Sequence, residues 1–121
     1  MPKPLPPTEY EECVAFAQYL DLRGLLFTHI AQETFTKNWG TKIKNKKMGV
    51  RKGFPDYAIC HNNKLLLLEM KRKKNSRISP EQDNWLKKLA KVQGVISAVC
   101  YGADEAIKVV EEELIKNYEQ N

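Results

Sequence analysis

The chain has 121 residues, of which 42% are apolar and 29% are charged, and its formal net charge is +5. These values are typical of a globular domain and exclude a disordered chain, and no stretch is long and apolar enough to predict a membrane span or secretory leader. Three widely spaced cysteines without a CxxC pattern favour free thiols in a reducing cytoplasm. The sequence therefore predicts one domain over residues 1–121 and no membrane partner.

The positive charge is concentrated in the middle of the chain. Residues 1–35 hold 2 basic and 5 acidic side chains, residues 36–94 hold 16 basic and 4 acidic ones, and residues 95–121 hold 2 basic and 6 acidic ones. Because a concentrated basic surface attracts polyanions, we expect the middle of the chain to bind one.

In chain order, the first expected elements are a flexible lead-in, a helix and a strand. Residues 1–7 are rich in proline and are expected to be flexible. Thr8 is a suitable N-cap for a helix that runs to about Arg23 and stops at Gly24. The apolar run at 25–30 then predicts a strand.

Residues 36–52 combine many lysines and arginines with Trp39 and contain no acid. The pattern predicts a mobile, structureless loop, which is uncommon in a compact domain unless it has a function. Basic side chains next to an aromatic ring suit phosphate contacts and base stacking, and the alternative is a solvated insertion without function. The expected nucleic-acid contacts here are Lys37, Lys42, Lys44, Lys46, Lys47, Arg51 and Lys52.

Two short apolar runs, at 57–60 and 65–68, flank an Asn-Asn pair at 62–63. Asparagine tolerates positive φ, so the pair suits a two-residue type I′ hairpin turn. In that register the numbers of paired residues sum to 125, and Asp56 therefore faces Glu69. The sequence predicts a buried central hairpin with two acids at its open end.

This register places an acidic pair beside an amine. Asp56 and Glu69 would repel each other across the strands, where opposed Cβ atoms lie about 5 Å apart. Lys71 follows Glu69 by two residues and so lies on the same face. A divalent cation would remove the repulsion, and oxygen ligands at an open site suit Mg²⁺ or Mn²⁺. The alternative is a strand-end salt bridge between Lys71 and one acid.

A second basic loop follows the hairpin and leads into a helix. Ser79 is a suitable N-cap, Pro80 fits the first helical position, and Gln82 completes a capping box, while Gly94 is expected to end the helix. By pattern alone, Gln82 need do no more than cap. The expected nucleic-acid contacts in the loop are Arg72, Lys73, Lys74 and Arg77.

A strand at 95–101 and a last helix after Gly102 complete the chain. The expected order is α-β-β-β-α-β-α. It predicts an α/β fold with a mixed central sheet and helices on both faces.

These motifs resemble those of a nuclease family. Asp56 with Glu69-Met70-Lys71 looks like the PD-(D/E)xK motif. The segments KGFPD at 52–56, LEMK at 68–71 and SPEQ at 79–82 together resemble the VRR-NUC family, over roughly residues 8–101. The segment at 29–33, HIAQE, is similar to that family's His-Ile-Pro-Asn-Glu but departs from it at two positions.

The resemblance implies a restriction-endonuclease-like core and a set of roles. Asp56, Glu69 and the backbone carbonyl of Met70 would bind Mg²⁺ or Mn²⁺. Auxiliary acids would be Glu33 and one of Glu9 and Glu12, of which we take Glu12 as the candidate. The implied catalytic residues are Asp56, Glu69, Lys71, which would position the attacking water, and Gln82, which would support the site.

The function implied is that of a metal-dependent, structure-selective DNA endonuclease that hydrolyses phosphodiester bonds, with a Holliday-junction resolvase as one form. Minimal one-domain members of the family resemble phage and bacterial proteins and are associated with homodimers acting on branched DNA, so we expect both partners. The alternatives are an idle nucleic-acid-binding module of the same fold, a flap or single-strand nuclease, and a restriction-type nuclease, for whose recognition domain little chain is left.

Overall fold

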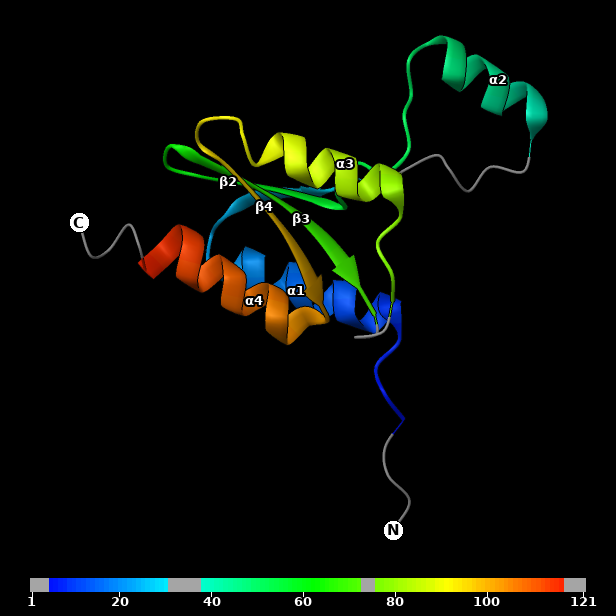
Figure 1. The fold of residues 1–121 in the computed structure, drawn as a ribbon. Coiled ribbons are helices and arrows are strands. Elements are labelled where there is room, and N and C mark those ends of the chain that lie inside the picture. Colours follow the sequence, from blue (N-terminus) through cyan, green and yellow to red (C-terminus); the bar gives the residue numbers. More distant parts are fainter. Residues whose placement is uncertain (1–4, 31–37, 73–75, 117–121) are drawn as a thin grey trace.

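The computed structural model describes residues 5–30, 38–72 and 76–116 (Figure 1). The predicted order of helices and strands is confirmed, with one additional helix, α2, between the first two strands. None of the helices in these three ranges has the length and hydrophobicity needed to cross a membrane. The elements are α1 (Glu9–Leu22), β1 (Leu26–His29), α2 (Trp39–Lys47), β2 (Tyr57–His61), β3 (Lys64–Lys71), α3 (Pro80–Leu89), β4 (Val95–Tyr101), α4 (Ala103–Val110) and a π-helical extension of α4 (Glu111–Lys116).

The four strands form one mixed sheet in the order β1-β2-β3-β4. The β1–β2 and β2–β3 pairs are antiparallel, and β4 returns parallel to β3 after the α3 crossover. Tyr57 pairs with Leu68 and Cys60 with Leu65, so the predicted hairpin register is confirmed. The sheet is therefore the expected meander with a fourth strand added by a helical crossover.

The hairpin turn differs from the prediction. Among the described non-glycine residues Asn62 alone has a positive φ, 55°, whereas a type I′ turn needs positive φ at both central residues. The register does not depend on that turn type alone, because a one-residue slip would turn Glu69 toward the core cluster that holds Leu66 and Leu68.

Helices cover both faces of the sheet (Figure 1): α1 and α4 lie on one side and α3 on the other. Leu66 and Leu68 of β3 belong to the core cluster that includes Phe16 of α1 and Val110 of α4. Since successive strand residues point to opposite faces, Glu69 points to the face covered by α3. The continuous apolar run of β3 is thus explained by burial on both sides.

Both predicted helix starts are confirmed. The Thr8 side chain accepts a hydrogen bond from the backbone N–H of Glu11, and the Glu11 side chain accepts one from the backbone N–H of Thr8. The same reciprocal capping box joins Ser79 and Gln82 at the start of α3. These motifs satisfy backbone N–H groups that a helix leaves without internal partners.

The end of α3 was predicted too late. The helix stops at Leu89, five residues before Gly94, and the chain then turns through the bonds from Val92 N to Leu89 O and from Val95 N to Val92 O. Val92, which lies between Leu89 and Gly94, is 53% exposed. Without a buried side chain there, the helix gains no packing from a further turn.

The prediction of a structureless loop over 36–52 is wrong, because the described part of this segment, 38–52, contains α2. Asn38 caps this helix by accepting a hydrogen bond from the backbone N–H of Thr41, and lysines in its last turn suit the helix dipole. No residue of α2 is buried, and Figure 1 shows it standing away from the sheet. Because α2 buries no apolar stripe, the sequence lacks the periodic signal by which a packed helix is recognised.

The segment that leads to Asp56 packs against the start of α3. A Cβ on Gly53, whose φ is +95°, would lie 2.7 Å from the carbonyl carbon of Glu81. Next to it, the indole N–H of Trp85 donates to the backbone oxygen of Lys52 at 3.1 Å, and the Phe54 ring packs edge-on against Trp85 at 5.0 Å. This contact fixes where β2 begins relative to α3.

Two glycines with nearly the same φ allow this contact to be tested. Gly49 has a φ of +96° and open space around it, so Gly49→Ala should lose only the cost of the strained backbone, on the order of 1 kcal/mol. Gly53→Ala should lose about 2 kcal/mol more, because its methyl group also meets the α3 backbone. Urea unfolding measures both losses, and equal losses would contradict a tight contact at Gly53.

Candidate active site

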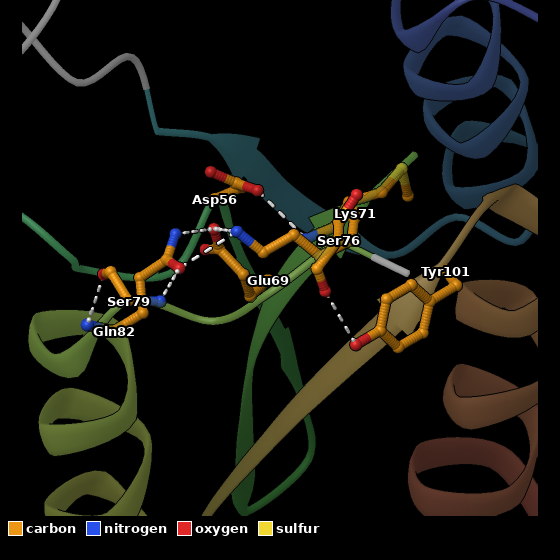
Figure 2. A network of polar contacts seen from close by, with 8 residues as sticks. Asp56, Glu69, Lys71, Ser76, Ser79, Gln82 and Tyr101 are labelled. Atoms are coloured by element: carbon orange, nitrogen blue, oxygen red, sulfur yellow. Dashed lines mark hydrogen bonds and ion pairs between the residues drawn. The ribbon is translucent and has the colours of Figure 1, made fainter. Parts of the chain in front are cut away.

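Asp56 lies immediately before β2 and is fixed to both neighbouring strands. Its backbone oxygen accepts a hydrogen bond from Ile30 N at 2.6 Å, and its Oδ2 accepts one from Met70 N at 2.9 Å. The second bond draws the carboxylate to β3 beside Glu69 (Figure 2). The two acids thus meet at the open end of the hairpin, on the same side of the sheet.

Glu69 has a buried carboxylate of which only one oxygen is hydrogen-bonded. The residue is only 4% exposed, and its Oε1 accepts a hydrogen bond from Gln82 Nε2 at 2.6 Å. Lys71 Nζ lies 3.8 Å from the same oxygen. The other oxygen, Oε2, is buried and has no hydrogen-bond partner among the described residues. A buried carboxylate oxygen without a hydrogen bond destabilises the folded state unless it binds a cation or a proton.

Gln82 joins the amine to the acid. Its Oε1 accepts hydrogen bonds from Lys71 Nζ and from the Ser79 backbone N–H, both at 2.9 Å, while its Nε2 donates to Glu69 (Figure 2). The capping pattern predicted only the bond at the helix start. The same amide also orients Lys71 and Glu69, which no local signal could indicate because β3 and α3 must first pack together.

The environment disfavours two ionised acids in this pair. Burial, followed by the charge of Asp56, raises the pKa of the Glu69 carboxyl from 4.5 to about 7, and Lys71 opposes this shift. Burial also raises the pKa of Asp56, against the hydrogen bond from Met70 N and the charge of His29. The pair is therefore poised to take up positive charge.

The donor set at the pair fits a hard divalent cation. Two carboxylates supply oxygen ligands of the kind that Mg²⁺ and Mn²⁺ prefer, and Glu69 Oε2 is an available buried oxygen. No cluster of three or more His, Cys, Asp or Glu side chains suited to a metal occurs within 5–30, 38–72 and 76–116. Glu33, an expected auxiliary acid, lies outside the described residues.

The acids of the first helix have different positions. Glu12 Oε2 accepts a hydrogen bond from Ala103 N, so Glu12 satisfies the start of α4, whose N-cap Gly102 has no side chain to do so. The charge of Glu9 instead raises the pKa of Asp56. Of the two acids that the sequence left open, Glu9 is the one whose charge acts on the pair, and Glu12 is occupied at α4.

The expected nucleic-acid contacts have different surroundings in the structure. Arg51 donates to the Lys46 and Val50 backbone oxygens at the end of α2, and Lys52 forms an ion pair with Glu81 at 3.3 Å. Lys42 Nζ lies 5.5 Å from the ring centroid of Trp39, which is 75% exposed. Exposed positions also hold Lys44, Lys46, Lys47, Arg72 and Arg77, while Lys37, Lys73 and Lys74 lie outside the described residues.

Comparisons with known proteins agree on one family. The family model described as "VRR-NUC domain" matches residues 10–104. A solved structure titled "VRR_NUC domain protein" is similar with a TM-score of 0.69 and 26% identity, covering 92% of this chain and 89% of that one. A second, titled "VRR_NUC domain", shares the fold with a TM-score of 0.62 and 17% identity, covering 87% and 96%. No match was found among the curated proteins compared.

The raised pKa of Glu69 predicts how stability depends on pH. Below pH 4.5 the carboxyl is protonated both folded and unfolded, and between pH 4.5 and about 7 the folded state holds the proton more tightly. The metal-free protein should therefore lose stability as pH rises through this window, by at most about 3 kcal/mol. Glu69→Gln should remove this loss, as measured by urea unfolding at pH 5 and pH 8.

Glu112→Gln is the matched control, because Glu112 is exposed. It should retain the wild-type slope of stability against pH. A Glu69→Gln protein with the same slope would show that this carboxyl is not the group responsible.

Proposed function

The chain belongs to the VRR-NUC family of nuclease domains, and from this premise we propose that it is a metal-dependent, structure-selective DNA endonuclease. One observation supports the proposal above others. The buried Glu69 Oε2 has no hydrogen-bond partner among the described residues, beside a second carboxylate and an oriented ammonium group. The proposed domain is the whole of residues 1–121.

Asp56, Glu69 and the backbone carbonyl of Met70 are the proposed ligands of Mg²⁺ or Mn²⁺. When bound, such an ion polarises a phosphate oxygen and lowers the pKa of a bound water. The chain's own contribution is to hold the acids in place. Met70 N fixes Asp56, and Gln82 Nε2 fixes Glu69, so neither carboxylate has to reorganise when the substrate arrives.

Lys71 is proposed to orient the attacking water and to stabilise negative charge that develops on the phosphate. Its side chain is 17% exposed, and Gln82 Oε1 holds its ammonium group at 2.9 Å. A partly desolvated, positioned cation stabilises developing charge more than a freely moving one in water does. Gln82 acts through Lys71 and Glu69 and is a positioning residue.

The lysines of α2 are proposed to bind the phosphate backbone of DNA. They lie on a helix that stands away from the sheet (Figure 1), and this helix begins at the exposed Trp39. This helix, called here the basic arm (Trp39–Lys47), lies outside the catalytic centre. Such a position suits a substrate that extends past the cleaved bond. Branched DNA and a C₂ homodimer, which would give a four-way junction two symmetric cuts, are the corresponding proposed partners.

The main alternative is an idle module that binds nucleic acid without cutting it. A decayed site would be expected to lose a member of the network, whereas Asp56, Glu69, Lys71 and Gln82 are all present and three of them are joined through the Gln82 amide. The nuclease is therefore the preferred reading.

Cleavage by site variants tests the proposal. Asp56→Asn, Glu69→Gln and Lys71→Met should each reduce cleavage of a labelled DNA junction or flap in Mg²⁺ or Mn²⁺ by at least about 100-fold, because each removes a charge at the reacting phosphate. Asp104→Asn makes the same chemical change at an exposed position of α4 and should cut at the wild-type rate. Wild-type cleavage by Asp56→Asn would overturn the site assignment.

The salt dependence of binding tests the role of α2. Replacing Lys42, Lys44, Lys46 and Lys47 by Gln should weaken binding to all DNA sequences alike and flatten the slope of log affinity against log salt by roughly one unit per lost phosphate contact. Lys108→Gln with Lys116→Gln, on α4 and its extension, is the comparison for lysines outside the arm. An unchanged slope in the α2 variant would show that its lysines are only solvated.

A further inference from the structure

A pocket of about 470 Å³ lies between α1 and the adjoining ends of β1 and β2. This volume is within the roughly 300–1,000 Å³ that small-molecule pockets occupy. Of the roles assigned above, only the effects of the Glu9 and His29 charges on Asp56 involve its lining residues. Its walls include Glu9, Cys13, Val14, Ala17, His29 and Tyr57.

One wall of the pocket is a stack of two flat rings. The His29 and Tyr57 rings are nearly parallel, at 12°, with centroids 4.4 Å apart. Phe16 packs edge-on against Tyr57 at 5.1 Å, which anchors the stack to the core. His29 is exposed, whereas Tyr57 is 1% exposed and its hydroxyl has no hydrogen-bond partner among the described residues. The Tyr57 hydroxyl is buried beside the Cys13 thiol, so what the wall offers a ligand is a rigid aromatic surface.

The opposite wall is the face of α1 that carries Cys13, Val14 and Ala17, and it is largely apolar. The charged lining residue is Glu9, a carboxylate. Apolar walls with an acid disfavour a phosphate group and favour a neutral, flat ligand with hydrogen-bond donors. The exocyclic and ring N–H groups of a nucleobase are such donors.

The pocket adjoins the carboxylate pair. Tyr57 and Asp56 point to opposite faces of the sheet, but the charges of Glu9 and His29, which line the pocket, act on the Asp56 carboxyl around the end of the strands. Ile30, which follows His29, also donates its backbone N–H to Asp56 O at 2.6 Å. A ligand in the pocket would therefore lie next to the position proposed for the scissile phosphate.

We propose that this pocket receives one unpaired nucleobase flanking the scissile phosphate, which stacks on the exposed ring of His29. This inference rests on the proposed nuclease function and narrows its substrate. A base held in a duplex is stacked and paired and cannot enter, whereas a base at a branch, in a flap or in a single strand can. The pocket would then select DNA by structure, independently of the phosphate contacts of α2.

Base-specific fluorescence tests the proposal. A single-stranded oligonucleotide carries 2-aminopurine at one position at a time and is bound in Ca²⁺, with its integrity checked on a gel. Stacking on a ring should change the emission at one position by several-fold in the wild type. An abasic site at that position should weaken binding by roughly tenfold, as expected for one base stacked on an aromatic side chain.

A matched pair of variants connects the signal to the pocket. Ala17→Trp fills the pocket and should abolish the position-specific change, whereas Ala15→Trp makes the same change at an exposed position of the same helix and should retain it. Ala17→Leu and Ala15→Leu form a milder pair should Ala17→Trp prove unfolded by urea titration. His29→Ala should reduce the emission change without filling the pocket.

The outcomes separate this inference from the proposed function. If no position responds, or if the Ala17 variants respond as the Ala15 variants do, the nucleobase pocket is wrong even where the wild type cleaves DNA. If the wild type cleaves no DNA in Mg²⁺ or Mn²⁺ but the response is present and is lost in the Ala17 variants, the nuclease proposal fails and the base-binding site stands.

Discussion

The burial of Glu69 is the constraint on which the rest of the site depends. A carboxylate that is 4% exposed between a sheet and a helix must be hydrogen-bonded, neutralised or protonated. One oxygen is satisfied by Gln82, which can reach it because the first turn of α3, capped by Ser79, lies beside the end of β3. The same helix start holds Lys71. Gln82, in the first turn of one helix, therefore fixes both the Glu69 carboxylate and the Lys71 ammonium group and sets their relative orientation.

The two faces of the sheet are held by different kinds of contact. The side covered by α1 and α4 holds the main core cluster, in which Phe16, Leu66, Leu68 and Val110 are fully buried. The side covered by α3 is held partly by polar contacts, such as the Ser97 hydroxyl that donates to the Leu86 backbone oxygen at 2.8 Å. Apolar packing on one face can thus stabilise the fold while the other face accommodates charged groups, whose burial would otherwise be costly.

The basic side chains of α2 and the acidic pair of the site also lie in separate places. The helix α2, which carries basic side chains, stands away from the sheet (Figure 1), whereas Asp56 and Glu69 lie at the end of the hairpin (Figure 2). A polyanion can therefore be attracted at a distance by the basic arm without meeting the acids first. The pocket beside Asp56 adds an aromatic and mainly apolar surface, which recognises a base rather than a phosphate.

The sequence by itself determined the elements whose signals lie in a few adjacent residues. The N-cap residues Thr8 and Ser79 predicted two helix starts, and the two-residue turn at 62–63 predicted the hairpin register and placed Asp56 opposite Glu69. The spacing of Glu69 and Lys71 put both on one face. Alternation along a strand and the chemistry of a helix start are local properties, so they can be read without knowing what packs against them.

Only the tertiary structure decided the contacts between distant elements. In the folded chain, Glu12 binds the start of α4, and Glu9 is the first-helix acid whose charge acts on Asp56. Gln82 binds two residues of β3, Glu69 and Lys71. The tertiary structure also ended α3 at Leu89 and formed α2 without a buried face. Residues 91 positions apart, such as Glu12 and Ala103, meet only after the sheet and both helix layers have packed. No local pattern in the sequence encodes such a contact, because its free energy comes from burial shared among many elements.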